Sequence, residues 1–272
     1  MARVVLGDEP AVQVPIQVID ATFGNPPGNC HNADISPADG GFNGILGLGP
    51  FVQDCGSACA PPYNRNGMYY ACSGSGCIGT AVPLTEQVTN PVALLPEDNN
   101  GIIVQLPNVP PGGSISVNGQ LLFGIGTKAN NTPSPVVVAY AVDQNTGDFS
   151  TAFGGNNLSG FLDTGSNGLF FPSFLSSLPS CRPPNSDWFC PSTTANLSAT
   201  NIGAFGSPAE PVSFKIGNFI NLISSPNNVF SDVGGDDPNE FDWGLPFHLG
   251  RNVCIGIEGR PSGLGTGPYW AY

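Results

Sequence analysis

The sequence predicts an all-β protein, and its composition is the first support for this class. The chain of 272 residues contains 37 Gly and 28 Pro but only 10% charged residues. Long helices are excluded, because helix surfaces need charged residues and helix interiors exclude Pro. Many short strands joined by turns fit this composition. The length suits one large all-β domain or two lobes of about 130 residues each.

Alternating apolar residues and turn residues place the expected elements along the chain. Residues 2–20 predict two strands separated by a turn at residues 7–10. A Gly-rich apolar strand is expected at 44–49 and a short helix at 82–88. Turn and extended-chain residues at 128–135 predict a domain boundary. Further strands are expected at 102–106, 120–126, 136–142, 149–153, 160–162, 211–216, 241–247 and 253–258.

The charge and the cysteines indicate where the protein works. A net charge of −13 would repel a nucleic acid or an anionic membrane, so neither partner is expected. No segment is long and apolar enough to span a bilayer, and no signal peptide opens the chain. Eight cysteines favour an oxidising compartment, so a secreted, periplasmic or cell-surface protein is expected. Met1 would then not be the natural precursor start.

The spacing of the cysteines predicts disulfides. Four lie in a loop-rich stretch at 54–80 and could close two local rings or cross-pair: Cys55, Cys59, Cys72 and Cys77. Zinc binding is the competing interpretation, although these spacings are not paired C-x2-C knuckles. Cys181 and Cys190 are expected to close a surface loop. Cys30 and Cys254 are left over. They could pair with each other or stay buried thiols, or Cys30 could pair with a segment missing from this sequence.

A single carboxylate, Asp163, follows an apolar run and is followed at once by Thr164, Gly165 and Ser166. Burial at the end of an apolar strand raises the pKa of a carboxylate, whereas hydroxyls and the amides of a tight Gly turn hold its orientation. This pattern predicts an acid placed for catalysis.

The ordered set of motifs resembles the pepsin-like aspartic peptidases. It comprises Ile45-Leu46-Gly47, Leu122-Phe123-Gly124, Asp163-Thr164-Gly165-Ser166 and Trp243-Gly244. The wording of several segments is also similar to a family of exported bacterial proteins of unassigned function with two Asp-Thr/Ser-Gly motifs. The resemblance implies a bilobal pepsin-like fold. Residues 1–131 would form an incomplete N-terminal lobe with the cysteine-rich loop 54–80, and residues 132–272 a complete C-terminal lobe.

The resemblance also implies a function. Asp163, Thr164, Gly165 and Ser166 would form one half of a catalytic site that hydrolyses an extended peptide or protein substrate without metal or cofactor. Such enzymes use two carboxylates that share one proton, and this chain has one Asp-Thr-Gly motif. We therefore expect the other aspartate in a missing N-terminal segment, and the 272-residue chain alone to be inactive.

Three alternatives stay open beside this interpretation. The chain could be a non-catalytic pseudopeptidase of the bacterial envelope that holds a peptide or protein in its cleft. Two chains could each supply Asp163 across a two-fold axis. Phosphoryl transfer through an aspartyl-phosphate also uses an Asp-Thr-Gly sequence, but it needs an α/β fold that this helix-poor chain does not predict.

Weaker signals are given structural interpretations. The acidic residues at 232–242 are expected to form a solvated turn rather than a calcium site, because their spacing is not that of an EF-hand. His31 and His248 are expected to be structural. The aromatic residues at 269–272 are expected to cover the edge of a core.

Overall fold

The computed structural model describes residues 1–19, 34, 36–63, 67–73 and 76–272. They form two compact units, Met1–Asn99 and Asn100–Tyr272. The structure is mostly β, as predicted, and no helix of the described residues is longer than five residues. The predicted lobe boundary at 131–132 differs from the division between these two units at 99–100, and it stays a prediction.

The first unit has short elements. Its strands and helices are β1 (Ala2–Val4), β2 (Val12–Val14), α1 (Pro37–Gly40), β3 (Tyr70–Ser73) and β4 (Gly76–Gly79), with 3-10 helices η1 (Gly56–Cys59), η2 (Leu84–Glu86) and η3 (Pro91–Leu94). β1 and β2 form the predicted antiparallel hairpin, in which Val4 faces Val12. β3 and β4 form a second hairpin.

Two predictions in this unit are wrong. The helix expected at 82–88 is only the 3-10 turn η2. It ends before Gln87, because Gln87 is extended and buried and its side-chain amide donates to the carbonyls of Gly56 and Val82. Residues 44–49 are not a strand, and Ile45 is 77% exposed. No strand of the described residues pairs with this segment, and an apolar run without a neighbouring strand cannot form a ladder.

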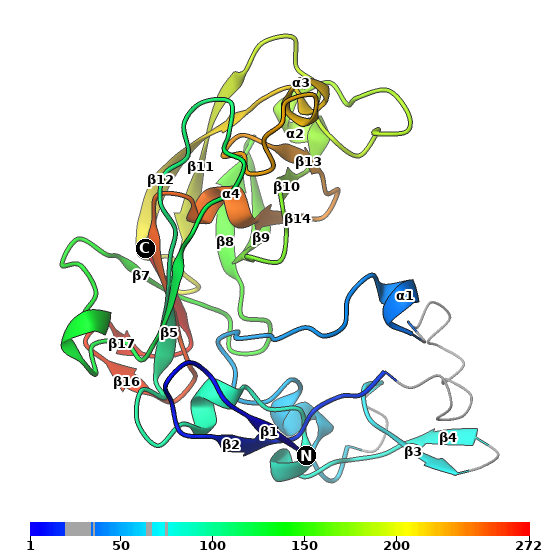
Figure 1. The fold of residues 1–272 in the computed structure, drawn as a ribbon, viewed down its shortest axis with the longest axis vertical. Coiled ribbons are helices and arrows are strands. Elements are labelled where there is room, and N and C mark those ends of the chain that lie inside the picture. Colours follow the sequence, from blue (N-terminus) through cyan, green and yellow to red (C-terminus); the bar gives the residue numbers. More distant parts are fainter. Residues whose placement is uncertain (20–33, 35, 64–66, 74–75) are drawn as a thin grey trace. The chain divides into compact units, whose positions relative to one another are not determined.

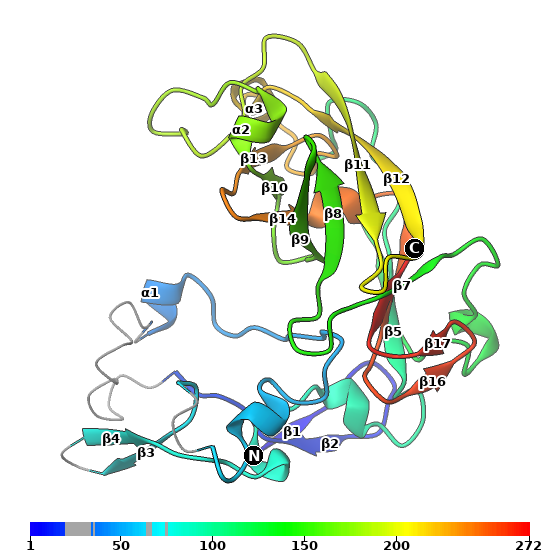
Figure 2. The ribbon, with the colours of Figure 1, turned by 180° about the vertical axis from the view of Figure 1, so that it is seen from behind.

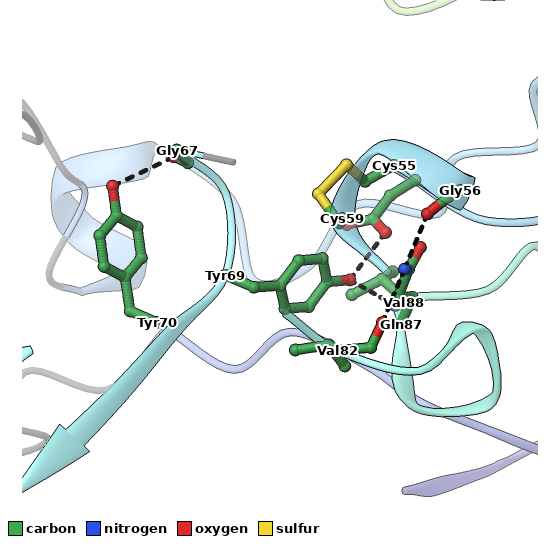
Figure 3. Close-up of a disulfide and its surroundings, with 10 residues drawn as sticks. Cys55, Gly56, Cys59, Gly67, Tyr69, Tyr70, Val82, Gln87 and Val88 are labelled. Carbon is green, nitrogen blue, oxygen red and sulfur yellow. Dashed lines mark hydrogen bonds between the residues drawn. A yellow bond between two sulfur atoms is a disulfide. The ribbon is translucent and has the colours of Figure 1, made fainter. Parts of the chain in front are cut away.

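Figure 3 shows the Cys55–Cys59 disulfide and the hydrogen bonds around it. The hydroxyl of Tyr69 donates to Asp54 at 2.7 Å and accepts from the amide of Val88 at 2.8 Å. Burial, more than the hydrogen bond with Asp54, raises the pKa of Tyr69 to about 12. The hydrogen bonds of Tyr69 with Val88 and of Gln87 with Gly56 thus hold this loop to the segment that follows it, whereas the disulfide closes a ring within the loop.

The second unit contains two larger sheets (Figure 1). Its strands are β5 (Gly101–Gln105), β6 (Gln120–Phe123), β7 (Ala139–Ala141), β8 (Phe149–Phe153), β9 (Asn156–Leu162), β10 (Leu169–Phe171), β11 (Ala195–Ile202), β12 (Ala209–Ile216), β13 (Gly234–Asp236), β14 (Glu240–Trp243), β15 (Asn252–Gly256), β16 (Pro261–Ser262), β17 (Gly265–Thr266) and β18 (Tyr269–Ala271). Its helices are η4 (Ala129–Asn131), α2 (Ser173–Ser176), α3 (Phe219–Ile223) and α4 (Leu245–His248).

The larger sheet has the strand order β12-β11-β8-β9-β14-β10-β13 and curls into a half-barrel (Figure 2). β9 pairs antiparallel with β8 on one side and parallel with β14 on the other. Gly160 permits this packing, because a Cβ atom there would lie 2.2 Å from Oγ1 of Thr151 on β8. β14 therefore lies between β9 and β10, although about 80 residues separate it from β9 in the sequence.

The five-stranded sheet has the order β6-β5-β15-β18-β7. Its core contains Ile103, Ile125, Cys254, Tyr269 and Ala271, so the C-terminal aromatic segment is part of a core, as expected. Cys254 is a buried free thiol, and burial raises its pKa to about 11.

The described residues contain three disulfides: Cys55–Cys59, Cys72–Cys77 and Cys181–Cys190. The local pairing of Cys55 with Cys59 and of Cys72 with Cys77 contradicts the zinc interpretation for these four residues. Cys30 and His31 lie outside the described residues. Three disulfides are consistent with an extracytoplasmic location.

Thiol titration tests this disulfide set. Six of the eight cysteines are in disulfides, so denatured, unreduced protein should expose at most two reactive thiols. Ellman's reagent or alkylation with mass spectrometry gives the count, and fully reduced protein is the control. Six or more reactive thiols, or zinc bound at one equivalent, would contradict the structure.

Candidate functional site

Asp163 lies directly after β9, where the strand passes into the Asp-Thr-Gly turn. Its amide still donates to the carbonyl of Trp243 at 3.3 Å, so the ladder with β14 continues to this residue. Leu162 before it is buried, whereas Thr164 and Gly165 after it are exposed. The carboxylate is therefore half-buried at the point where the sheet ends.

The turn holds both oxygens of the Asp163 carboxylate. The amide of Gly165 donates to Oδ1 at 2.7 Å, and the hydroxyl of Ser166 donates to Oδ2 at 3.1 Å. A Cβ atom at position 165 would lie 3.0 Å from Oδ1 of Asp163, which is closer than an ordinary van der Waals contact. Gly, which has no Cβ atom, allows this approach. The structure thus brings Asp163, Gly165 and Ser166 together, whereas Thr164 is exposed and makes no hydrogen bond to the carboxylate among the described contacts.

β14 lies against this turn. In the parallel ladder Asp242 is opposite Phe161 and Trp243 is opposite Leu162. The amide of Leu245 donates to the carbonyl of Ser166 at 2.6 Å. A Cβ atom at Gly244 would lie 2.6 Å from that same carbonyl oxygen, so the close contact requires Gly. The strand expected at 241–247 ends at Trp243, and residues 244 and 245 pack directly against the turn.

Asp242 is a second carboxyl group near this turn, and the solvated turn expected for it is wrong, because it lies in the buried strand β14. Its side chain is 6% exposed, and within the described residues its Oδ1 has no hydrogen-bond partner. Burial raises the pKa of Asp242 to about 7, and the negative charges of Asp163, Asp237 and Glu240 add to this rise. A side-chain hydrogen bond with Ser166 opposes it. The signal available in the sequence was the position of Asp242 between Phe241 and Trp243 on an expected strand.

The acidic residues at 232–242 do not form one solvated turn, as was expected, because Asp236 ends β13 and Glu240 and Asp242 lie in β14. Asp236 accepts a hydrogen bond from the amide of Ser173 at 2.7 Å. Asp237 accepts from the amides of Asn239 and Glu240 at 2.8 and 3.2 Å. Among the described residues no group of three or more His, Cys, Asp or Glu side chains is arranged to hold a metal ion.

His248, at the end of α4, is 1% exposed. Its Nδ1 lies 3.2 Å from the carbonyl of Gly244, which can only accept, so Nδ1 carries the proton. Nε2 is then an acceptor, and it has no partner within the described part of the chain. Burial lowers the pKa of His248 to about 4; Arg251 contributes to this and Asp163 opposes it. The ring is therefore neutral near neutral pH, and its partnered Nδ1 gives it the structural role that we expected.

A small hollow of about 170 Å³ lies on the other face of β14, lined by Trp243 together with Phe214, Lys215, Phe247 and Arg251. Asp163 does not line it. This hollow is therefore separate from the carboxylate site.

The fold and the site define a mostly β, disulfide-bonded protein with one structured Asp-Thr-Gly turn. The chain belongs to the family described as "Protein of unknown function (DUF3443)", whose profile matches residues 1–272. A search of curated proteins gave no match. Within the described residues, no helix has the length and apolar character needed to cross a bilayer.

The buried carboxyl predicts a pH-dependent effect of Asp242→Asn on stability. The pKa of Asp242 is raised in the folded state, so the folded protein binds an extra proton between about pH 4 and pH 7. The stability that this neutral acid gives is present below pH 4 and is lost as the pH rises to 7. Asn carries no charge, so the variant should gain stability relative to wild type over this window, by about 1 kcal/mol per pH unit.

Urea denaturation at half-unit pH steps measures this difference. His248 has the opposite slope, because its lowered pKa costs stability as the pH falls from 6.5 to 4, and it is present in both proteins and cancels. Asp187→Asn removes an exposed carboxylate and controls for the change of charge. A difference between Asp242→Asn and wild type that stays constant from pH 4 to pH 7 would show that Asp242 is not a buried acid.

Proposed function

We propose that Asp163 is one catalytic carboxylate of an aspartic-peptidase-like hydrolase with a pepsin-like fold. The observation that carries this proposal is the fixation of both its oxygens, by the Gly165 amide and the Ser166 hydroxyl, at an accessible end of the sheet. A carboxylate that accepts a proton from water must keep its orientation and remain within reach of solvent. Asp163 meets both requirements, and Thr164 completes the exposed turn.

The position of β14 supports this assignment. It lies between β9 and β10, and Gly244 lets it pass directly against Ser166. The support for this assignment is the order of β9, β14 and β10 in the sheet, and all three strands belong to the second unit.

The chemistry requires a second accessible carboxyl group. In an aspartic peptidase one carboxylate activates water while the other, protonated, polarises the scissile carbonyl. Asp242 cannot take this part, because it is buried and cannot touch a substrate. The proposed enzyme is therefore a longer protein with another Asp-Thr/Ser-Gly motif, acting outside the cytoplasm on an extended peptide or protein substrate.

A comparison of two proteins tests this proposal. The 272-residue chain should not cleave an unfolded protein substrate between roughly pH 3 and 6, where coupled carboxylates titrate. A longer protein with the second motif should cleave it, and Asp163→Asn should lower the rate at least 100-fold, because the two carboxyls work as a unit. Asp143→Asn is the matched control, since Asp143 also accepts backbone amides in a turn, at 2.8 and 3.1 Å.

Other outcomes would assign other functions. Inactivity of both proteins, with binding of an extended peptide, would favour the non-catalytic pseudopeptidase. Cleavage by the 272-residue chain that Asp163→Asn abolishes would contradict the need for a second motif and favour a dimer in which each chain supplies Asp163.

A further inference from the structure

The hollow of about 170 Å³ lies at an edge of the larger sheet. β12 is the last strand in the order of that sheet, and four consecutive residues of it, 212–215, line the hollow. Successive residues of a strand project to opposite faces, so a hollow that touches all four opens at the edge of the strand. Val212 is buried and Phe214 half-buried, whereas Ser213 and Lys215 are exposed. The hollow therefore has an apolar side and a polar side.

α4, which follows β14 (Figure 1), completes the apolar side. The ring centre of Phe247 on α4 lies 5.2 Å from that of Trp243, which lies 5.3 Å from that of Phe214. Trp243 and Phe247 are buried, and Leu169 and Pro246 beside them are buried too. Rings and aliphatic side chains from three elements thus form the floor of the hollow.

Arg251 lies on the polar side. Its guanidinium lies 4.4 Å from the ring centre of Phe247 and donates to the carbonyl of that residue. A guanidinium has five N–H groups, and this is its single hydrogen bond within the described residues. The other guanidinium nitrogens are not among the fully buried polar atoms without a partner, so solvent reaches them. Arg251 is therefore held in place by Phe247 and keeps donors for a ligand.

Lys215 gives the hollow a second positive charge. The chain has only 7 Lys and Arg residues and a net charge of −13, so two cations at one small hollow reverse the sign of the charge locally. Asp232 interacts with Lys215 but does not line the hollow, and neither does any other acidic residue of the described chain. Ser213 and Ser231 add hydroxyl groups. This side suits a ligand group that is anionic and accepts hydrogen bonds.

We propose that this hollow binds a small carboxylate with an apolar body, of the size of benzoate. The planar guanidinium of Arg251 matches the two oxygens of a carboxylate, and Lys215 adds a charge at the rim. The apolar body packs on Trp243 and Phe247. The volume fits, because a dry apolar cavity of about 150 Å³ holds one benzene molecule. Asp163 does not line the hollow, so this binding site is independent of the proposed function.

Both sides of the hollow are needed for this selectivity. An inorganic anion would use the two cations but would leave the floor around Trp243 and Phe247 in contact with water. An uncharged ring would cover that floor but would take the half-buried guanidinium of Arg251 out of water without an acceptor, which costs free energy. A carboxylate on an apolar body meets both requirements.

Titration of the whole chain with sodium benzoate, followed by ¹H–¹⁵N NMR, tests the site. The indole N–H of Trp243 donates to Thr151 beside the hollow, and its resonance should shift saturably with a dissociation constant below about 1 mM. The other two Trp residues, Trp188 and Trp270, do not line the hollow, and their indole resonances should stay in place. Trp188→Phe and Trp270→Phe assign the three signals.

Matched ligands separate the two parts of the interaction. Benzamide has the shape of benzoate without its charge and should bind at least about tenfold more weakly, because hydrogen bonds to a charged group are lost. Acetate and inorganic phosphate keep the charge without the ring. Each should also bind at least about tenfold more weakly, because neither buries the apolar floor.

Variants locate the cations that act. Arg251→Gln keeps a donor for the Phe247 carbonyl but removes the charge, and it should weaken benzoate binding at least about tenfold. Lys215→Gln removes an exposed charge and should weaken binding about two- to fivefold. Arg182→Gln makes the same change of charge at an exposed position outside the hollow and should leave binding unchanged.

Ser213→Glu is the second test of the site. It places a carboxylate at an exposed position on the rim, where it should repel benzoate and weaken binding at least about tenfold. It replaces Arg251→Gln if circular dichroism shows that this variant does not fold.

Three results would overturn the proposal. The first is the absence of a saturable shift of the Trp243 indole up to about 10 mM benzoate, ten times the expected constant. The second is equal binding of benzamide, which would show a merely apolar hollow. The third is equal binding of phosphate, which would show a merely cationic surface. Asp163→Asn should bind benzoate as the wild type does, so failure here is distinguishable from failure of the proposed function.

Discussion

The site depends on the insertion of β14 between β9 and β10. This insertion brings together segments about 80 residues apart, and its core is aromatic: the rings of Phe241 and Trp243 stack at 4.3 Å, and Phe171 on β10 stacks on Phe241 at 5.1 Å. Burial of such rings stabilises a fold by roughly 2–3 kcal/mol each. The same insertion sets Asp242 beside Ser166, so the force that builds the sheet also buries the acid.

A buried polar chain reinforces the same strands. The indole of Trp243 donates to Thr151 at 3.2 Å, Thr151 donates to Asn201 at 2.8 Å, and the amide of Asn201 donates to the hydroxyl of Tyr272 at 2.9 Å. These groups come from β14, β8, β11 and the C-terminus, so one hydrogen-bonded line crosses the sheet. Because each buried donor in this line of side chains has an acceptor, the hydrogen bonds fix the register of β14 at little cost in desolvation.

Local patterns carried most of what the sequence could predict. The alternation in residues 211–216 and 149–153 predicted β12 and β8. The cysteine spacings predicted disulfides and the Cys181–Cys190 pair, but they left the pairing within the loop 54–80 open. The Asp163 turn was predictable because its donors lie two and three residues away. Residues 44–49 misled, since an apolar run forms a strand only beside another strand. The solvated turn expected for Asp242 was wrong because its burial comes from pairing with β9, which no local pattern encodes.

The cost of Asp242 is an argument for its use. An apolar residue of similar size would suit its place between two buried aromatic rings, whereas a carboxyl group there leaves one oxygen without a partner among the described residues. Turn-forming acids such as Asp237 offset their own desolvation through backbone amides, whereas Oδ1 of Asp242 has no such donor within the described part of the chain. Strongly perturbed acids of this kind cluster at functional sites. Asp242 is opposite Phe161, two residues before Asp163, so the buried acid and the accessible one lie at the same end of the sheet.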